Sequence, residues 1–488
     1  MREICDTNKY SFLAFSVLGF LFLGLIALLF SGGNSSFILS FSSFPSSTFS
    51  NSTSSSMSRP NPKTALYPSF TNKKKQIAVD KLIKELESES MSRRGKEKDK
   101  KLEKIEAGLA SARALIKQTT VSSLNHSRSS PLKDPDYVPH GDIYKNAYLF
   151  HRSYLLMESQ FKIYVYEEGE PPLFHYGPCT NIYAMEGLFL NFMEVDTRFR
   201  TYDPDQAHVF FLPFSVVMIL KHLFHPVIRD KAVLGRTIGD YVHTISSKYP
   251  YWNRSLGADH FMLSCHDWGP RSTWYVHQLY FTSIRVLCNA NTSEFFNPRK
   301  DASIPEINIR SGDISKLTGG YPPSNRTVLA FFAGHAHGRL RPTLFQHWKG
   351  KDEDIRVYEE VPPNISYQEM MKKSKYCLCP SGFEVASPRI VEAIYAECVP
   401  VLISQDYVLP FSDVLNWEAF SIQISVSDVP NLKKILLNIS EEEYIEKHER
   451  VKQVQHHFLV NDPPKRYDVF NMIIHSVWLR RLNLQILY

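Results

Sequence analysis

CLCPSGFEVASPRIVEAIYAECVPVLISQDYVLPFSDVLNW, residues 377–417, is the stretch that decides the fold. It opens with a short apolar run, turns through the Pro-Ser-Gly of 380–382, takes up a helical pattern near Ser387 and returns as a β-branched run at 399–403. This pattern predicts a strand, a helix and a second strand. The turn and the helix start expose backbone N–H groups and the positive end of the helix dipole, so we expect an anionic ligand there.

The helix of this unit carries the polar residues of interest. Ser387 suits the N-cap and Pro388 the first helical position. Arg389 and Glu392 lie three residues apart and therefore share a face. An ordinary solvated face is the alternative interpretation, but Glu384, eight residues before Glu392, places a second carboxylate at the loop-to-helix junction.

The same alternation extends towards the N-terminus. A first folded part begins near residue 141, and its last strand ends at His266-Asp267-Trp268-Gly269. The patterns predict strands at 161–167, 208–214 and 259–265, and helices at 143–159, 181–192 and 216–247. Strands that alternate with helices predict a parallel sheet covered on both faces, with ligands at the carboxyl ends of its strands.

A second folded part begins near residue 325. After its first strand, Arg339 and Arg341 precede a helix, where two guanidinium groups could grip a pyrophosphate. Exposed arginines at a helix start are the alternative. The remaining elements are predicted as strands at 327–334, 354–360 and 420–425, and helices at 343–348, 366–376, 440–458 and 467–482.

Five motifs identify a resemblance. FKIYVYEEGEPP, DPDQAHVFFLPFS, DHFMLSCHDWGP, FFAGHAHGRLRP and PSGFEVASPRIVEAIYAECVPVLISQDYVLPFSDVL lie within about 140–475. They resemble the plant branch of the exostosin-like glycosyltransferases, glycosyltransferase family 47. The resemblance implies an α/β fold of the GT-B type, in which two Rossmann-like domains face each other across a cleft. It implies an acceptor-side domain at 141–324 and a nucleotide-sugar domain with closing helices at 325–488.

The resemblance also implies a reaction, the inverting transfer of a sugar from a UDP-sugar to a polysaccharide such as pectin or hemicellulose. Displacing UDP requires stabilisation of the diphosphate, a fixed donor and a base for the acceptor hydroxyl. Glu384 and Glu392 are expected to fix the donor, with Glu392 on the ribose. The candidates for the diphosphate are Arg339, Arg341, Arg389, Ser381 and Gly382. Either His266 or Asp267 is expected to be the base, although His266 could equally be structural.

Two motifs suggest a metal, but neither is convincing. Asp203-Pro204-Asp205 has an Asp-x-Asp form that recurs at 134–136, so chance explains it. His335 and His337 lie on a glycine-rich turn without a nearby carboxylate and form a poor ligand set. We therefore expect no metal and no cofactor besides the UDP-sugar substrate.

Residues 11–30 form an uncharged apolar span that is long enough to cross a bilayer. Arg2 and Lys9 precede it and no Lys or Arg follows before Arg59, so the positive-inside rule predicts a cytosolic tail at 1–10 and a lumenal remainder. With the resemblance, this topology predicts a type II protein of the Golgi membrane. The net charge of +6 is small for 488 residues, and no nucleic-acid partner is expected.

The segment at 31–140 is predicted to be a lumenal stem. It begins rich in Ser, Thr and Pro, and later shows heptad spacing of apolar residues between Leu102 and Ile116. That spacing favours either a stem helix that forms a homo- or hetero-dimer or a single solvated helix. Glycosylation is expected at the sequons Asn34, Asn51, Asn125, Asn253, Asn291, Asn325, Asn364 and Asn438.

Two other functions remain open at this point. One is a catalytically silent lumenal subunit that binds a sugar ligand and supports a partner transferase. The other is a retaining transferase, which keeps the fold and changes the chemistry. The donor sugar, the acceptor and the disulfide pairing do not follow from the sequence.

Overall fold

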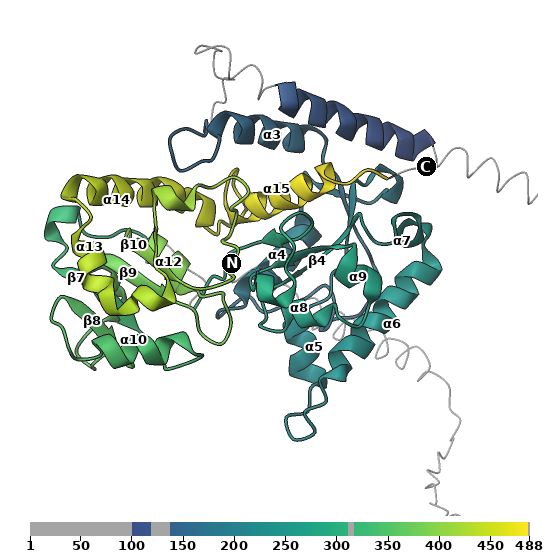
Figure 1. Ribbon diagram of the computed structural model, residues 1–488. Helices are drawn as coiled ribbons and strands as arrows, with labels where there is room; N and C mark the ends of the chain where they lie inside the picture. The colour runs from purple at the N-terminus through teal and green to yellow at the C-terminus, as the bar shows by residue number, and fades with distance from the viewer. Residues whose placement is uncertain (1–99, 119–136, 311–316, 487–488) are drawn as a thin grey trace, which may run out of the picture. The chain divides into compact units, whose positions relative to one another are not determined.

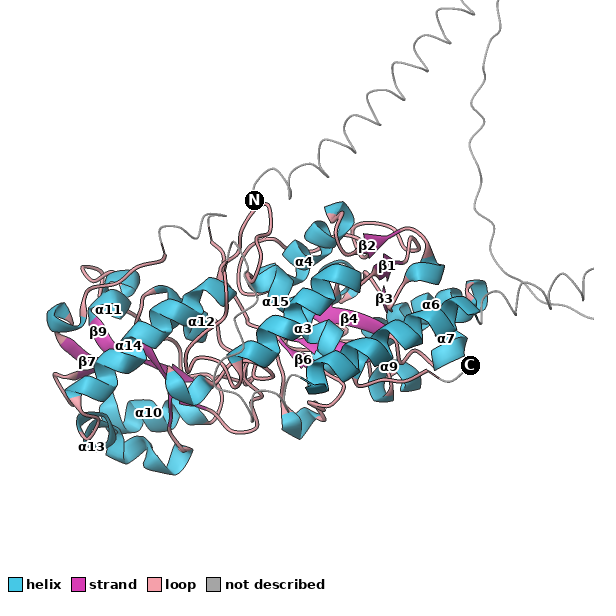
Figure 2. Ribbon diagram, turned by 90° about the horizontal axis from the view of Figure 1, so that it is seen from above, coloured by secondary structure: helices cyan, strands magenta, loops and turns pink. Residues whose placement is uncertain are grey.

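The computed structural model describes residues 100–118, 137–310 and 317–486, and contains two parallel β-sheets (Figures 1 and 2). The first sheet has the strand order β2-β1-β3-β4-β5-β6, and the second has the order β11-β10-β9-β7-β8. All neighbouring strands run parallel. The predicted α/β class with two parallel sheets is confirmed.

The first sheet is formed by residues between 163 and 303. The helical stretch expected at 216–247 is interrupted, because α5 ends before Pro226 and α6 begins after it. The short strands β2, β5 and β6 were not predicted. The strands are β1 Ile163–Val165, β2 Arg200–Thr201, β3 Val209–Phe211, β4 His260–Ser264, β5 Ile284–Leu287 and β6 Ala302–Ser303, and the helices are α3 Ala147–Gln160, α4 Ala184–Val195, α5 Val216–Leu223, α6 Ala232–Lys248, α7 Pro250–Ser255, α8 Gly269–Ser272 and α9 His277–Phe281.

The second sheet is formed by residues between 328 and 423. Its central strands β9 and β10 are almost entirely buried, as expected for strands covered on both faces. The strands are β7 Val328–Ala333, β8 Ile355–Tyr358, β9 Ser374–Pro380, β10 Val399–Ile403 and β11 Ile422–Gln423, and the helices are α10 Leu340–Trp348, α11 Tyr367–Lys373, α12 Arg389–Tyr395, α13 Leu432–Leu437, α14 Glu441–Gln455 and α15 Val469–Leu482. Short 3-10 turns are η1 Pro204–Gln206, η2 Thr292–Glu294, η3 Pro323–Asn325, η4 Trp417–Ala419, η5 Val426–Asn431 and η6 His456–Phe458.

Both sheets reverse their strand order once. In the first sheet the reversal lies between β1 and β3, and in the second between β7 and β9. At such a reversal the loops after the two strands diverge and leave a crevice at the carboxyl ends, where ligands of this fold class bind. The topology therefore predicts a ligand site at the loops after β7 and β9.

The last helix returns to the first sheet. α15 packs against β5, β6 and α3, and Figure 1 shows it beside α3. Its Arg480 donates from Nε to the Asp301 carbonyl at 2.8 Å and pairs through Nη1 with Asp413 at 2.5 Å. Because Asp301 precedes β6 and Asp413 follows β10, this arginine ties the two sheets together.

A helix at 100–118 changes the expected picture of the stem. Leu109 and Ala112, two of the heptad residues, are buried in the chain's own core, and Leu102 is buried as well. Within this helix Glu106 is buried as well and forms an ion pair with Arg481 of α15. The predicted stem therefore does not stay separate from the folded part up to residue 140, and the apolar seam expected to support a dimer is occupied within one chain.

Several predictions concern residues outside the described ranges, namely the tail at 1–10, the span at 11–30 and the sequons Asn34, Asn51 and Asn125. Within the described ranges, no helix has the length and apolar character needed to cross a membrane. The side chain of Asn291 is half-buried, whereas the other described sequons, Asn253, Asn325, Asn364 and Asn438, are exposed.

Among the described residues, each sheet carries one disulfide. Cys265 pairs with Cys288 at the ends of β4 and β5, and Cys377 of β9 pairs with Cys398, which precedes β10. Cys379 is a buried free thiol. The second disulfide encloses the loop after β9 and all of α12.

Candidate functional site

A cavity of ≈ 610 Å³ lies at the carboxyl ends of β7 and β9, the reversal point of the second sheet. The loops after both strands line one side, and residues that follow β4 and β6 of the first sheet line the other. Its charged and hydrogen-bonding side chains include Asp267, Glu306, Asn308, Arg341, Tyr367, Glu384, Arg389 and Glu392.

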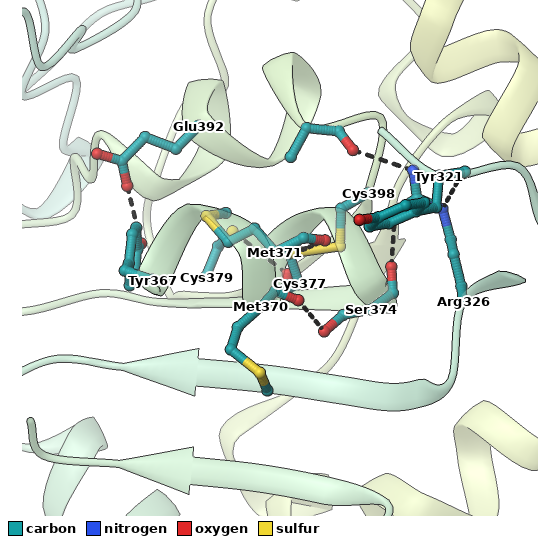
Figure 3. The surroundings of a disulfide bond; sticks show 11 residues. Tyr321, Arg326, Tyr367, Met370, Met371, Ser374, Cys377, Cys379, Glu392 and Cys398 are labelled. Carbon is teal, nitrogen blue, oxygen red and sulfur yellow. Dashed lines mark hydrogen bonds between the residues drawn. A yellow bond between two sulfur atoms is a disulfide. The ribbon is translucent and has the colours of Figure 1, made fainter. Parts of the chain in front are cut away.

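The position of α12 is set by several buried contacts. Figure 3 shows the Cys377–Cys398 disulfide beside this helix and Arg326 donating to the Ser374 carbonyl at 2.7 Å. Arg326 also donates to the Ala396 carbonyl at 3.0 Å. Tyr395 donates its hydroxyl to the Phe458 carbonyl at 2.6 Å. These contacts anchor the carboxyl end of α12, so the helix presents its first turn to the cavity in a defined orientation.

Glu392 in that first turn is held by two donors. The Tyr367 hydroxyl donates to Oε2 at 2.8 Å, and Asn308 Nδ2 donates to Oε1 at 3.2 Å. Figure 3 shows the Tyr367 hydrogen bond. A carboxylate oriented in this way can still accept hydroxyl donors from a ligand, because each oxygen has two acceptor sites.

Two arginines form the cationic side of the cavity. Arg389 donates from Nε and Nη2 to the Ala333 carbonyl, both at 3.1 Å, and Arg341 donates from Nη1 to the His335 carbonyl at 3.3 Å. Both guanidinium groups also lie over the Phe332 ring, at 5.2 Å for Arg389 and 5.8 Å for Arg341. Arg341 Nε is buried without a partner among the described residues.

Electrostatics indicate what this side of the cavity binds. Burial, followed by the charge of Arg389, lowers the pKa of Arg341 to about 10, so the guanidinium remains charged at neutral pH. The positive charges of Arg341 and Arg389 repel each other, and Arg341 Nε has no partner among the described residues. An anion bound between the two groups would relieve the repulsion and accept that hydrogen bond. The arrangement therefore suits a diphosphate, for which arginine provides paired donors.

Carboxyl groups line the rest of the cavity, Asp267 and Glu306 from the first-sheet side and Glu384 from the loop after β9. Tyr183 donates to Asp267 Oδ1 at 3.0 Å, and Asn289 Nδ2 donates to Glu384 Oε2 at 2.7 Å. Burial and neighbouring carboxylates raise the pKa of Glu384 to about 7 and that of Glu306 to about 8. Glu384 and Glu306 can therefore accept or donate protons near neutral pH.

Glu186 of α4 binds the residues at which the loop that carries Asp267 begins. This fully buried carboxylate accepts the Ser264 hydroxyl at 2.7 Å and the Cys265 amide at 3.1 Å, both at the end of β4. It also accepts the Ser215 hydroxyl at 2.6 Å and the Val217 amide at 3.0 Å. Four donors satisfy the buried charge and fix the start of the loop.

Most of the residues predicted from the sequence meet at this cavity. Asp267, Gly382 and Glu384 line it, as do Arg341, Arg389 and Glu392.

Three predicted residues do not line it. The Nδ1 atom of His266 accepts the Trp268 amide at 2.9 Å, its ring packs 4.9 Å from that of Tyr183, and burial lowers its pKa. Arg339 is exposed, and the Ser381 amide donates to the Ile403 carbonyl at 3.0 Å. Ser387 does not cap the helix as expected, because α12 begins at Arg389 with Pro388 at its N-cap.

Other cavity residues were missed by the sequence analysis, above all Glu306, Asn308 and Tyr367. Glu306 and Asn308 lie in an irregular segment after β6, and Tyr367 opens α11. Neither segment carries a motif, and only the alternation of Glu306, Ile307 and Asn308 could have indicated a polar face.

The described residues contain no group of three His, Cys, Asp or Glu side chains placed to hold a metal ion. Asp203 Oδ1 instead accepts the Asp205 amide at 3.0 Å, and Asp205 Oδ1 accepts the Tyr251 hydroxyl at 2.8 Å, so these two residues build a turn. Activity without a metal stays a prediction.

Comparisons with known proteins agree on one family. The Exostosin GT47 domain matches residues 157–439. A "Probable glycosyltransferase" of Arabidopsis thaliana is 68% identical over 387 residues, covering 79% of this chain and 82% of that protein. A second protein of that description from the same plant is 59% identical over 385 residues, covering 79% of this chain and 73% of that protein.

More distant relatives carry more specific names. A "Probable glucuronosyltransferase" of Oryza sativa is 27% identical over 354 residues, covering 65% of this chain and 81% of that protein. A "Probable beta-1,4-xylosyltransferase" of Arabidopsis thaliana is 27% identical over 344 residues, covering 65% and 82%. Among solved structures, MurG of Acinetobacter baumannii overlaps with a TM-score of 0.22 at 12% identity, covering 42% of this chain and 71% of that chain, which is too little to inform the fold. The chain belongs to the exostosin GT47 family and is a glycosyltransferase.

Proposed function

We propose that this glycosyltransferase moves a sugar, with inversion, from a UDP-sugar to a cell-wall polysaccharide such as pectin or hemicellulose. One observation carries the proposal. Two guanidinium groups and an oriented carboxylate, Glu392, share a cavity with carboxyl groups on its opposite side. The proposal includes a GT-B arrangement in which the second sheet binds the nucleotide and the first sheet binds the acceptor.

The cationic side supports departure of the diphosphate. Negative charge on UDP grows as the bond to the sugar breaks, and Arg341 and Arg389 are placed to stabilise that charge. Because both are partly fixed by backbone carbonyls and an aromatic ring, little reorganisation is needed at the moment of reaction. Gly382 lets the loop after β9 lie close to Arg341, since an added Cβ would lie 3.0 Å from its Nη2.

The oriented carboxylate fixes the donor. Glu392 accepts ribose hydroxyls in this proposal, while Tyr367 and Asn308 keep its orientation. Inversion requires a base on the side of the acceptor. Asp267, predicted from the sequence, and Glu306, found in the structure, are the carboxyl groups of the first-sheet side that can take the proton.

The wider setting also belongs to the proposal. The apolar span at 11–30 is proposed to anchor the protein in the Golgi membrane as a type II protein, with the catalytic part in the lumen. The relatives' names point to xylosyl or glucuronosyl donors as the first to be tested.

The test uses the full-length chain in mild detergent. Calorimetry should detect UDP binding with little affinity for uridine, because the arginines require a diphosphate. Release of UDP is then measured with UDP-xylose, UDP-glucuronate, UDP-galactose and UDP-arabinose, each with xylan or pectin oligosaccharides. NMR of the product anomer distinguishes inversion from retention.

The outcomes separate the rival functions. UDP binding followed by transfer with inversion supports the proposal, and transfer with retention would replace its chemistry. Glycan binding without turnover against any donor would favour the silent subunit, whose partner transferase would have to supply the activity.

A further inference from the structure

The segment after β6 places Glu306 at the cavity. It pairs with the loop before α4 through bridges between Tyr183 and Ile307 and between Asn181 and Ile309. In an extended segment successive side chains point to opposite sides, so Glu306 and Asn308 share the side opposite the buried Ile307 and Ile309. Asn308 donates a hydrogen bond to Glu392, the carboxylate proposed to hold the ribose. Glu306 lies two residues before Asn308, on the same side of the segment.

Glu306 differs in its partners from the other carboxyl groups of the cavity that are not exposed. Glu392, Glu384 and Asp267 each accept a side-chain donor. No described residue donates a hydrogen bond to the Glu306 carboxyl, although its side chain is only 6% exposed and lines the cavity. Because these oxygens face the cavity and have no donor among the described residues, they are free to accept a hydrogen bond from a ligand hydroxyl.

Burial and the charges around Glu306 set the pKa of its carboxyl group close to neutral pH. Burial raises its pKa most, the carboxylates of Asp267 and Glu392 raise it further, and Arg389 and Arg341 lower it, with a result of about 8. A base works best when its pKa lies near the working pH. The titratable and charged groups that face it are Asp267 and Tyr183 from the first sheet, Arg341, Arg389 and Glu392 from the second, and Tyr407 after β10.

We propose that Glu306 is the general base that takes the proton of the acceptor hydroxyl. This inference rests on the proposed transfer function. The acceptor oxygen forms a bond to the anomeric carbon while its proton passes to a Glu306 carboxylate oxygen. The bond from the anomeric carbon to the diphosphate breaks, and its electron pair leaves with UDP. Glu306 then returns the proton to water after the product departs. Asp267, held by Tyr183, positions the acceptor in this assignment.

The first experiment compares Glu306→Gln with the wild-type chain in the UDP-release assay. Turnover should fall by about 10² to 10⁴-fold, while the Kd of UDP stays within about threefold. The wild-type pH profile should rise through about pH 8, because the base must be ionised, and this limb should be absent from the residual activity of the variant. Glu353→Gln, at an exposed position after α10, is the matched control and should change neither quantity.

Other results would reassign the base. Near-wild-type turnover in a folded Glu306→Gln chain overturns the inference while leaving the proposed function intact. If Asp267→Asn abolishes the same pH limb and Glu306→Gln does not, Asp267 is the base. Failure of the wild-type chain to bind UDP would instead reject the proposed function.

A second measurement needs no turnover. UDP binding near pH 8 is measured by calorimetry in two buffers that differ in ionisation enthalpy, which reports protons taken up. The wild-type chain should take up protons, because the diphosphate raises the pKa of Glu306 further, and Glu306→Gln should take up fewer. Equal uptake in both chains would show that Glu306 does not titrate at the cavity and would remove it as the base.

Discussion

Replacing Gly334 by Ala should weaken UDP binding without removing any charged group. Gly334 follows β7, and a Cβ added there would lie 2.2 Å from Nη2 of Arg389. Ordinary contacts begin at 3.4 Å, so the guanidinium group would have to retreat by about 1.2 Å. A hydrogen bond to phosphate does not survive such a shift, because its length would exceed about 3.5 Å.

The expected magnitude follows from the bond that is lost. Hydrogen bonds to charged groups contribute about 1.5–3 kcal/mol, which corresponds to a rise of about ten- to 150-fold in the Kd of UDP. Gly334 has φ = +156°, where an alanine is strained, so the melting temperature should also fall; the Gly334 amide still donates to the Tyr358 carbonyl at 3.1 Å and helps to keep the fold. Calorimetry measures the affinity, and the melting temperature checks the fold.

Gly239 of α6 offers a matched control, because an added Cβ meets no atom within 4 Å. Gly239→Ala should leave UDP affinity unchanged and stabilise its helix by about 0.5–1 kcal/mol. Combining Gly334→Ala with Arg389→Ala should weaken binding no further than Arg389→Ala alone, since both changes remove one contact. A folded Gly334→Ala chain with wild-type affinity would show that Arg389 does not bind the diphosphate.

The remaining predictions concern the donor, the charges, the helix at 100–118 and metal. Glu392→Gln should raise the Kd of UDP by about ten- to 150-fold in calorimetry and lower kcat less, because a ribose contact exists in both ground and transition states; unchanged affinity would remove Glu392 from the ribose. UDP affinity should fall as pH rises from about 6 to 9, since Glu384 and Glu306, with pKa values of about 7 and 8, become anionic beside the diphosphate, and a flat profile of Kd against pH would contradict this. Leu109→Ala should lower the free energy of unfolding in urea by about 2–5 kcal/mol, whereas Lys104→Ala, at an exposed position, should change it by less than about 0.5 kcal/mol. Equal unfolding midpoints for the two variants would mean that the helix does not pack on the core. UDP release should survive EDTA, and complete loss that one added metal reverses would refute a metal-free mechanism.

The sequence alone determined the plan of the two sheets. Apolar runs that alternate with helical patterns predicted the parallel sheets. A strand covered by helices on both faces is apolar along its whole length, and the covering helices have an apolar period of their own, so both are visible in short stretches of sequence. The same local signals placed Gly382, Glu384, Arg389 and Glu392 around one loop and helix, since residues so close in sequence cannot lie far apart. Local patterns did not reveal β2 and β6, whose two residues each are too few to show a period.

Only the tertiary structure decided which residues share the cavity. Asn308 and Glu392 are far apart in the sequence, and packing of the segment after β6 against the loop before α4 brings them to 3.2 Å. Neighbours can also diverge: Asp267 faces the cavity, while His266 accepts the Trp268 amide. The heptad helix shows the same limit, because an apolar stripe specifies that a face will be buried but not against what, and here α15 and the core cover it.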